Sequence, residues 1–185
     1  DLSGEASAAP VCAALFSPGQ WATIAGNTPA GFTPFEQLLV SSIQSALTGT
    51  GINLQHPRTL LLLASTKGNI GLLKKDTAEP QETVGLDQSA KKIGKHLNYH
   101  SQPIVVSNAC ISGMSALLTA KRLMDAGLYD DAVVAGADCI SPFIIAGFRS
   151  FQALSDEVCK PFDQHRKGIN LGEAAATIIL SKKAG

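Results

Sequence analysis

Hydrophobic and polar positions along this chain change between two periods, one typical of helices and one of buried strands. A helix is predicted from Thr33, because TPFE at 33–36 is a capping-box pattern and the apolar residues after it recur on one face until Gly49. Three further segments favour helices, at 84–97, 111–127 and 141–155. Short apolar runs predict buried strands at 59–65, 103–107 and 131–137, and a closing strand at 174–181.

The first 32 residues carry many Ala, Gly, Ser and Pro and show little periodicity, so we expect them to be mostly irregular. The chain begins with Asp1 rather than with Met, as expected of a processed chain or a cloned fragment. No linker, low-complexity tract or short repeat divides the remainder.

Helices that alternate with strands covered on both faces predict an α/β fold. We expect a mainly parallel mixed sheet with helices on both faces, in which the last strand runs antiparallel. Ligands of such sheets gather at the carboxyl ends of the strands, so candidate chemistry is sought there.

Composition narrows the function classes. The chain is 45% hydrophobic and 16% charged, and fifteen basic and fifteen acidic residues cancel to a formal net charge of zero. Neither a nucleic acid nor a membrane is expected as a partner, because there is no basic excess, no signal peptide and no apolar run long enough to span a bilayer. A soluble, cytoplasmic protein is the expectation.

The four cysteines and four histidines are scattered, and none forms the CxxC or paired spacing of a zinc site. A disulfide framework is not expected in a chain that can build its own core. We therefore predict neither a metal nor another cofactor, and we interpret Cys12, Cys139 and Cys159 as packing residues.

Cys110 is the exception, because of its place between a strand and a helix. The apolar run 104–106 ends in Ser107 and Asn108, the cysteine follows, and a row of helix formers begins after Gly113. The start of a helix favours a thiolate through its N–H groups and dipole, and the same amides can stabilise an oxyanion. Position alone is equally compatible with a buried structural thiol.

The downstream segment CKPFDQHRKGINLGEAAATIIL (159–180) combines Asp163, Arg166 and Glu173 with glycines directly before a strand. Its prolines, glycines and Phe162 favour a packed, specified turn, although an exposed loop of ordinary surface charges is the alternative.

Taken together, SNACISGMSAL, AVVAGADCISPF and KPFDQHRKGINLGEAA resemble segments of the N-terminal half of the β-ketoacyl synthases, condensing enzymes of the thiolase-like fold. The resemblance implies that residues 1–185 form the N-terminal half of that fold and that the C-terminal half is absent. Two departures are Ile111, where many members have serine or alanine, and Ala174, where glycine is usual. The bulk of Ile111 leaves the substrate choice open.

The resemblance also implies roles for residues and partners. Cys110 would be the nucleophile, whereas Gly113, Asp163, Arg166, Gly172 and Glu173 would support it by fixing the neighbouring backbone. The implied partners are an acyl carrier protein that delivers acyl and malonyl groups, and a second copy of the chain paired through PIVVS at 103–107. Because the family's two catalytic histidines and its lysine belong to the second half, the isolated chain is expected to be inactive.

The expected function is a decarboxylative condensation in fatty-acid or polyketide-type biosynthesis. Two alternatives stay open. One is a cysteine hydrolase of the α/β-hydrolase type, although Asn108 and Ser112 stand where its nucleophile elbow has glycines. The other is a non-catalytic partner subunit of a condensing complex, against which the retained Cys110 argues.

Overall fold

The computed structural model describes residues 11–26, 28–73 and 84–182, and its centre is a four-stranded mixed sheet. The strands lie in the order β3 (Ile104–Val106), β2 (Thr59–Ala64), β4 (Asp131–Asp138) and β6 (Ala174–Ser181). Strand β2 pairs in parallel with both β3 and β4, whereas β6 runs antiparallel to β4. The predicted mixed sheet and its antiparallel last strand are confirmed.

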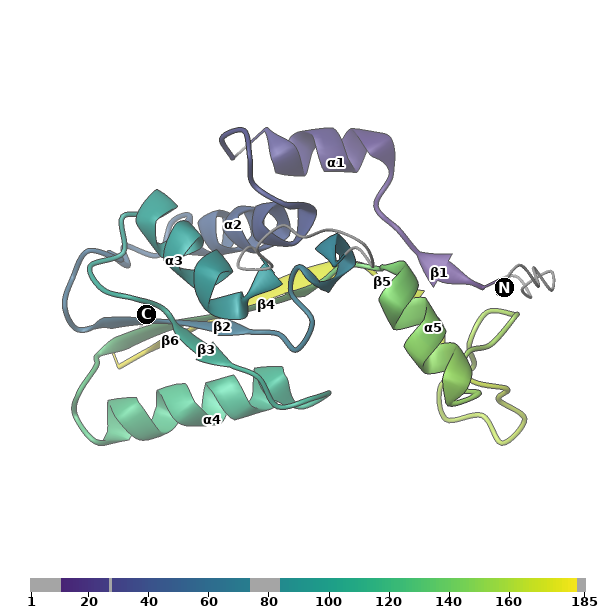
Figure 1. Cartoon of the computed structure of the whole chain (residues 1–185). Helices are drawn as coiled ribbons and strands as arrows, with labels where there is room; N and C mark the ends of the chain where they lie inside the picture. Colours follow the sequence, from purple (N-terminus) through teal and green to yellow (C-terminus); the bar gives the residue numbers. More distant parts are fainter. Residues whose placement is uncertain (1–10, 27, 74–83, 183–185) are drawn as a thin grey trace.

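Helices cover both faces of this sheet, as predicted (Figure 1). Helices α2 (Pro34–Leu47) and α3 (Leu86–His96) lie over one face, and α4 (Ser112–Asp125) lies over the other. Successive side chains of β2 point to opposite faces, so Leu61 and Leu63 join one core cluster while Leu60 and Leu62 join the other. Burial on both faces explains why TLLLLA is apolar throughout.

The N-terminal region contains more structure than we expected. Helix α1 (Pro18–Ala25) begins at a capping box, in which Ser17 Oγ accepts from the Gln20 amide and Gln20 Oε1 accepts from the Ser17 amide. A two-residue strand, β1 (Ala13–Ala14), pairs in parallel with β5 (Leu171–Gly172). The prediction of irregular structure is therefore wrong for these segments; residues 1–10 and 27 lie outside the described residues.

The strand before Cys110 is less buried than predicted. Strand β3 lies at the edge of the sheet, where β2 is its sole neighbour in the described chain, and Ile104 is exposed while Val105 and Val106 are half-buried. An apolar run favours a buried strand, but it does not reveal how many neighbours the strand has, and an edge strand buries less.

The helix expected over 141–155 is shorter in the structure. Helix α5 (Pro142–Ser150) begins, as predicted, at an N-cap serine, because Ser141 Oγ accepts from the Ile144 amide. It stops before Gln152, whose φ of 55° is left-handed.

A buried polar cluster joins three elements on the α2 face. Glu36, 3% exposed, accepts hydrogen bonds from the Thr33 amide, Ser89 Oγ and Lys92 Nζ. Asn69, at the start of the short 3₁₀ helix η1 (Ile70–Leu72), donates to both Glu36 and Ser89. The cluster fixes the loop after β2 between α2 and α3.

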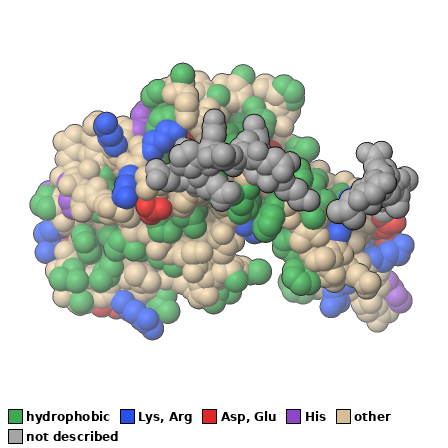
Figure 2. Space-filling view, in the orientation of Figure 1, with side chains coloured by type: hydrophobic (Ala, Val, Ile, Leu, Met, Phe, Trp, Pro, Cys, Tyr) green, Lys and Arg blue, Asp and Glu red, His purple; other side chains and the backbone are tan. Residues whose placement is uncertain are grey.

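The surface of the described chain exposes several large hydrophobic side chains, which Figure 2 shows over α4 and α5. They include Met114 and Leu118 on α4, Phe143 on α5, and Phe151, Val158 and Phe162 in the segment after it. None of the helices in the described ranges is long and apolar enough to cross a membrane.

Candidate active site

The backbone makes a sharp turn between β3 and α4, and Cys110 lies on it with an exposed side chain. Ala109 has a φ of 45°, which is unusual for a residue with a side chain. Ser112 stabilises the turn, because its hydroxyl accepts a hydrogen bond from the Asn108 amide (2.8 Å) and donates one to the Ala109 carbonyl (2.8 Å). Asn108 Nδ2 also donates to Ser115 Oγ (3.0 Å). The turn presents the thiol at the carboxyl end of the sheet.

A pocket of about 330 Å³ opens beside this thiol. Most of the residues that line it are small and come from the ends of β2 and β4, the start of α4 and the start of β6. They include Ala64, Ala109, Gly113, Gly136, Ala137, Gly172 and Ala174–Ala176. The structure thus brings the predicted residues Gly113 and Gly172 together with Cys110. Small side chains leave the room that a substrate chain needs to reach the sulfur.

Gly136 keeps β2 and β4 close together at the mouth of this pocket. A Cβ atom at this position would lie 3.1 Å from the carbonyl oxygen of Ala64, which is tight for a backbone contact. By contrast, a Cβ atom on Gly113 would meet no atom within 4 Å. The first glycine is therefore needed for strand packing, whereas the second leaves open space beside Cys110.

The predicted residues Asp163 and Arg166 lie on an exposed loop and do not line the Cys110 pocket. They contact each other locally: Asp163 Oδ1 accepts from the His165 amide, and the Arg166 guanidinium donates to the Asp163 carbonyl. The packed turn expected here is not seen over 160–167, where every side chain is exposed. Their predicted supporting role remains a prediction.

Sequence reasoning missed the residue that ties this loop down. Asn170 accepts from the Cys159 amide through Oδ1 and donates to the Glu157 carbonyl through Nδ2, across 11 and 13 residues. Gly168, two residues earlier, has a φ of 149°, and a Cβ there would lie 2.7 Å from the Ala153 carbonyl oxygen. Asparagine and glycine close together before a strand are typical of a specified turn.

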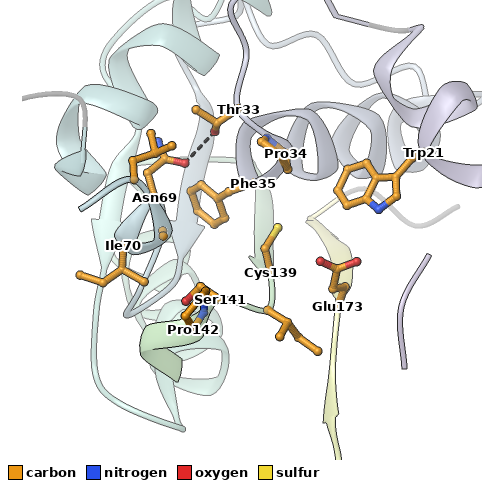
Figure 3. Close-up of a pocket in the computed structure, with 14 residues that line it drawn as sticks. Trp21, Thr33, Pro34, Phe35, Asn69, Ile70, Cys139, Ser141, Pro142 and Glu173 are labelled. Atoms are coloured by element: carbon orange, nitrogen blue, oxygen red, sulfur yellow. Dashed lines mark hydrogen bonds between the residues drawn. The ribbon is translucent and has the colours of Figure 1, made fainter. Parts of the chain in front are cut away.

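Glu173 lies between two residues of the Cys110 pocket, but its side chain lines a second cavity of about 370 Å³ (Figure 3). This cavity also contains Trp21, Phe35 and Cys139. Burial raises the pKa of the Cys139 thiol to about 12, and the nearby carboxylates of Glu173 and Asp138 add to the effect. A thiol held protonated is a poor nucleophile, so Cys110 is the better candidate.

The described residues contain no group of three or more His, Cys, Asp or Glu side chains that could hold a metal ion. None of the four histidines lines the Cys110 pocket. The chemistry that these described residues offer is therefore that of an accessible thiol at the start of a helix.

Comparison with protein families gives one match that spans most of the chain. The model of the β-ketoacyl synthase N-terminal domain matches residues 21–184. The match includes the Cys110 turn, the pocket beside it and the loop that carries Asp163 and Arg166.

Individual relatives agree with this match. Mellein synthase of Phaeosphaeria nodorum is 30% identical over 159 residues, which is 80% of this chain but 9% of that protein. The ketoacyl synthase alpha subunit of the tetracenomycin polyketide synthase of Streptomyces glaucescens is 34% identical over 85 residues, which is 42% of this chain and 20% of that protein. The chain thus spans a minor part of the length of these relatives.

Solved structures agree on the fold. The ishigamide ketosynthase/chain length factor superimposes with a TM-score of 0.75 at 22% identity, covering 93% of this chain and 47% of that one. The fold is therefore thiolase-like, and because the family model matches nearly all of the described sequence, this chain belongs to the β-ketoacyl synthase family.

Proposed function

We propose that Cys110 is the nucleophile of a β-ketoacyl synthase that condenses an acyl thioester with a malonyl thioester on a carrier protein. The observation that carries the proposal is the exposed thiol on a strained turn, at the start of α4 and beside a pocket of small residues. Membership of the condensing-enzyme family supports it.

The first step of the proposed reaction loads the enzyme. The Cys110 thiolate attacks the carbonyl carbon of the acyl thioester and a new C–S bond forms. The bond from that carbon to the carrier sulfur breaks, and the carrier thiolate leaves and takes up the proton that Cys110 gave up. The backbone N–H groups at the start of α4 attract negative charge, so they are suited to stabilise the oxyanion that forms in this step.

The second step makes the product. Loss of CO₂ from the malonyl thioester leaves a carbanion, which attacks the acyl carbonyl held on Cys110. A C–C bond forms, the C–S bond breaks, and the thiolate of Cys110 is restored. The histidines and the lysine that assist this step in the family belong to its second half, and no histidine lines the Cys110 pocket, so we propose that this chain alone does not condense the two substrates.

A second copy of the chain is the proposed structural partner. Strand β3 leaves one side of its backbone unpaired in the described chain, and such an edge is suited to antiparallel pairing with its own copy. Replacing the exposed Ile104 by Lys should weaken such a dimer, as measured by light scattering on the full-length protein. An unchanged mass would contradict pairing through β3.

The test of the function compares two cysteine variants in the complete protein. Cys110→Ser should reduce formation of the β-ketoacyl product by about 10³-fold or more, because a serine hydroxyl is not ionised at neutral pH. Cys139→Ser should retain most of the activity, because that thiol is protonated in a separate cavity. An active Cys110→Ser variant would exclude the proposed mechanism.

The same assay separates the alternatives. Release of a free acid without a condensed product would identify a thioesterase. A wild-type Cys110 that never accepts an acyl group would identify a non-catalytic partner subunit.

A further inference from the structure

The Cys110 pocket contains a charged pair that the proposed mechanism does not use. Among the described residues that line the pocket, the two with charged side chains are Lys67 and Asp138. Their Nζ and Oδ2 atoms are 3.8 Å apart. The pair therefore lines the same pocket as the Cys110 thiol.

The backbone of Lys67 is held firmly at the carboxyl end of β2. Ser65, a buried residue, accepts hydrogen bonds through Oγ from the amides of Lys67 and Gly68, and its own amide donates to the Val106 carbonyl at the end of β3. Gly68 then continues with a φ of 48°, against the side chain of Leu86. The loop is thus tied to the same two strands that deliver Cys110.

The ammonium group of Lys67 retains capacity for another acceptor. Its distance of 3.8 Å to Asp138 exceeds hydrogen-bond length, and the side chain, which lines the pocket, is 30% exposed. Lys92 differs, because its ammonium lies 2.7 Å from the buried carboxylate of Glu36. An ammonium has three N–H donors, so Lys67 can bind a second carboxylate while Asp138 orients it.

We propose that Lys67 is a positioning residue that binds the carboxylate of a carboxylated acyl thioester beside Cys110. The inference rests on the proposed function and assigns a residue to the binding of its malonyl substrate. Binding the carboxylate does not by itself favour loss of CO₂, because the interaction stabilises the reactant as well. Lys67 should therefore affect the KM for the carboxylated substrate more than kcat.

Two alkylating reagents test this inference on the chain without any acyl transfer. Iodoacetate and iodoacetamide both form a C–S bond with the thiolate and expel iodide, and they differ in that only the first carries a carboxylate. The ratio of their rates at Cys110, followed by peptide mass spectrometry, cancels the intrinsic reactivity of the thiol. It therefore reports the local preference for an anion.

Lys67→Met should lower the iodoacetate-to-iodoacetamide ratio by about threefold or more, since it removes a nearby positive charge at a partly exposed site. Lys67→Arg should preserve the ratio, and Asp138→Asn should raise it by removing the competing carboxylate. Lys91→Met is the matched control, because Lys91 lies on α3 outside this pocket and should leave the ratio unchanged.

An unchanged ratio in Lys67→Met would overturn the inference, as would an equal fall in Lys91→Met. If the ratio responds as expected but the complete protein forms no acyl-Cys110, the anion site stands and the proposed condensation fails. In a condensing protein, Lys67→Met should raise the KM for the malonyl substrate with little change in kcat; the reverse pattern would also overturn it.

Discussion

Cys110 follows β3 and Cys139 follows β4, and the two thiols have different surroundings and therefore different chemistry. Cys110 is exposed at the start of α4. Cys139 follows β4 and is half-buried in the cavity shared with Glu173, where burial and two carboxylates raise its pKa to about 12. The difference arises from burial and neighbouring charges, not from the residue type.

At the residue scale, the raised pKa of Cys139 predicts slow alkylation at neutral pH. Because a thiolate is the reacting form, the rate at Cys139 should rise by about tenfold per pH unit until the pH approaches its pKa. Removing one neighbouring negative charge lowers the pKa, so Glu173→Gln should speed this reaction. Peptide mass spectrometry after iodoacetamide treatment measures each thiol separately.

Glu157→Gln provides the control, because this glutamate is not among the causes of the Cys139 shift. Labelling of Cys139 as fast as Cys110 at neutral pH would contradict the assignment of roles to the two thiols.

Some residues of the candidate site could be predicted from the sequence, and others could not. The position of Cys110 and its neighbours Gly113 and Gly172 followed from local patterns and from the family resemblance. Lys67 could not be predicted in this way, because it lies on a loop more than forty residues upstream. The parallel pairing of β2 with β3 brings that loop to Cys110. The left-handed turn at Ala109 carried no signal either, since alanine does not favour positive φ.

At the scale of elements, the Glu36 cluster is the feature that joins α2, η1 and α3. Burial raises the pKa of Glu36, but hydrogen bonds from Lys92, Thr33 and Ser89 lower it by more, so the net shift is downward. A carboxyl group with a lowered folded-state pKa stabilises the fold at neutral pH. That contribution is lost as the pH falls through the lowered pKa.

Glu36→Gln should therefore reduce the free energy of unfolding by about 1–3 kcal/mol at neutral pH, because a charged acceptor within a buried cluster is removed. The difference from wild type should shrink in acid, where Glu36 becomes protonated. Urea unfolding at neutral and acidic pH, followed by circular dichroism, measures both effects.

Asp87→Asn is the matched control for this prediction. Asp87 forms an exposed i,i+4 ion pair with Lys91 on the same helix, so its loss should cost about 0.5 kcal/mol or less. Equal costs for the two variants would show that the buried cluster adds nothing to stability.

Elements with a strong period and clear end signals were predictable, and those defined by their neighbours were not. The period of α2 and its capping box at Thr33 placed that helix correctly. Helix α1 was not predicted, because its capping box at Ser17 lies within a segment rich in small residues. The edge position of β3 depends on strand order, which short-range patterns do not encode.

At the scale of the whole molecule, the exposed hydrophobic side chains point to surfaces that further protein covers. The chain covers 47% of the ishigamide ketosynthase/chain length factor structure. Phe162 is fully exposed, Phe151 is 79% exposed and Val158 is 76% exposed. Apolar side chains gathered in this way are typical of an interface.

Phe162→Ser should leave the stability of this chain unchanged within about 0.5 kcal/mol, because the side chain makes no buried contact here. In a complete protein of the length of these relatives, the same change should cost about 2 kcal/mol or more through lost burial. Thermal unfolding of both lengths makes the comparison. A similar small effect in both would show that no further segment covers Phe162.

The most direct test of the central claim is to locate the acyl group after the protein has been incubated with an acyl thioester. Proteolysis at mildly acidic pH, followed by tandem mass spectrometry, identifies the modified residue. We predict a single acyl thioester on Cys110, none on Cys139, and no modification in the Cys110→Ser variant. An acyl group on another residue, or none on any residue, would contradict the assignment of Cys110 as the nucleophile.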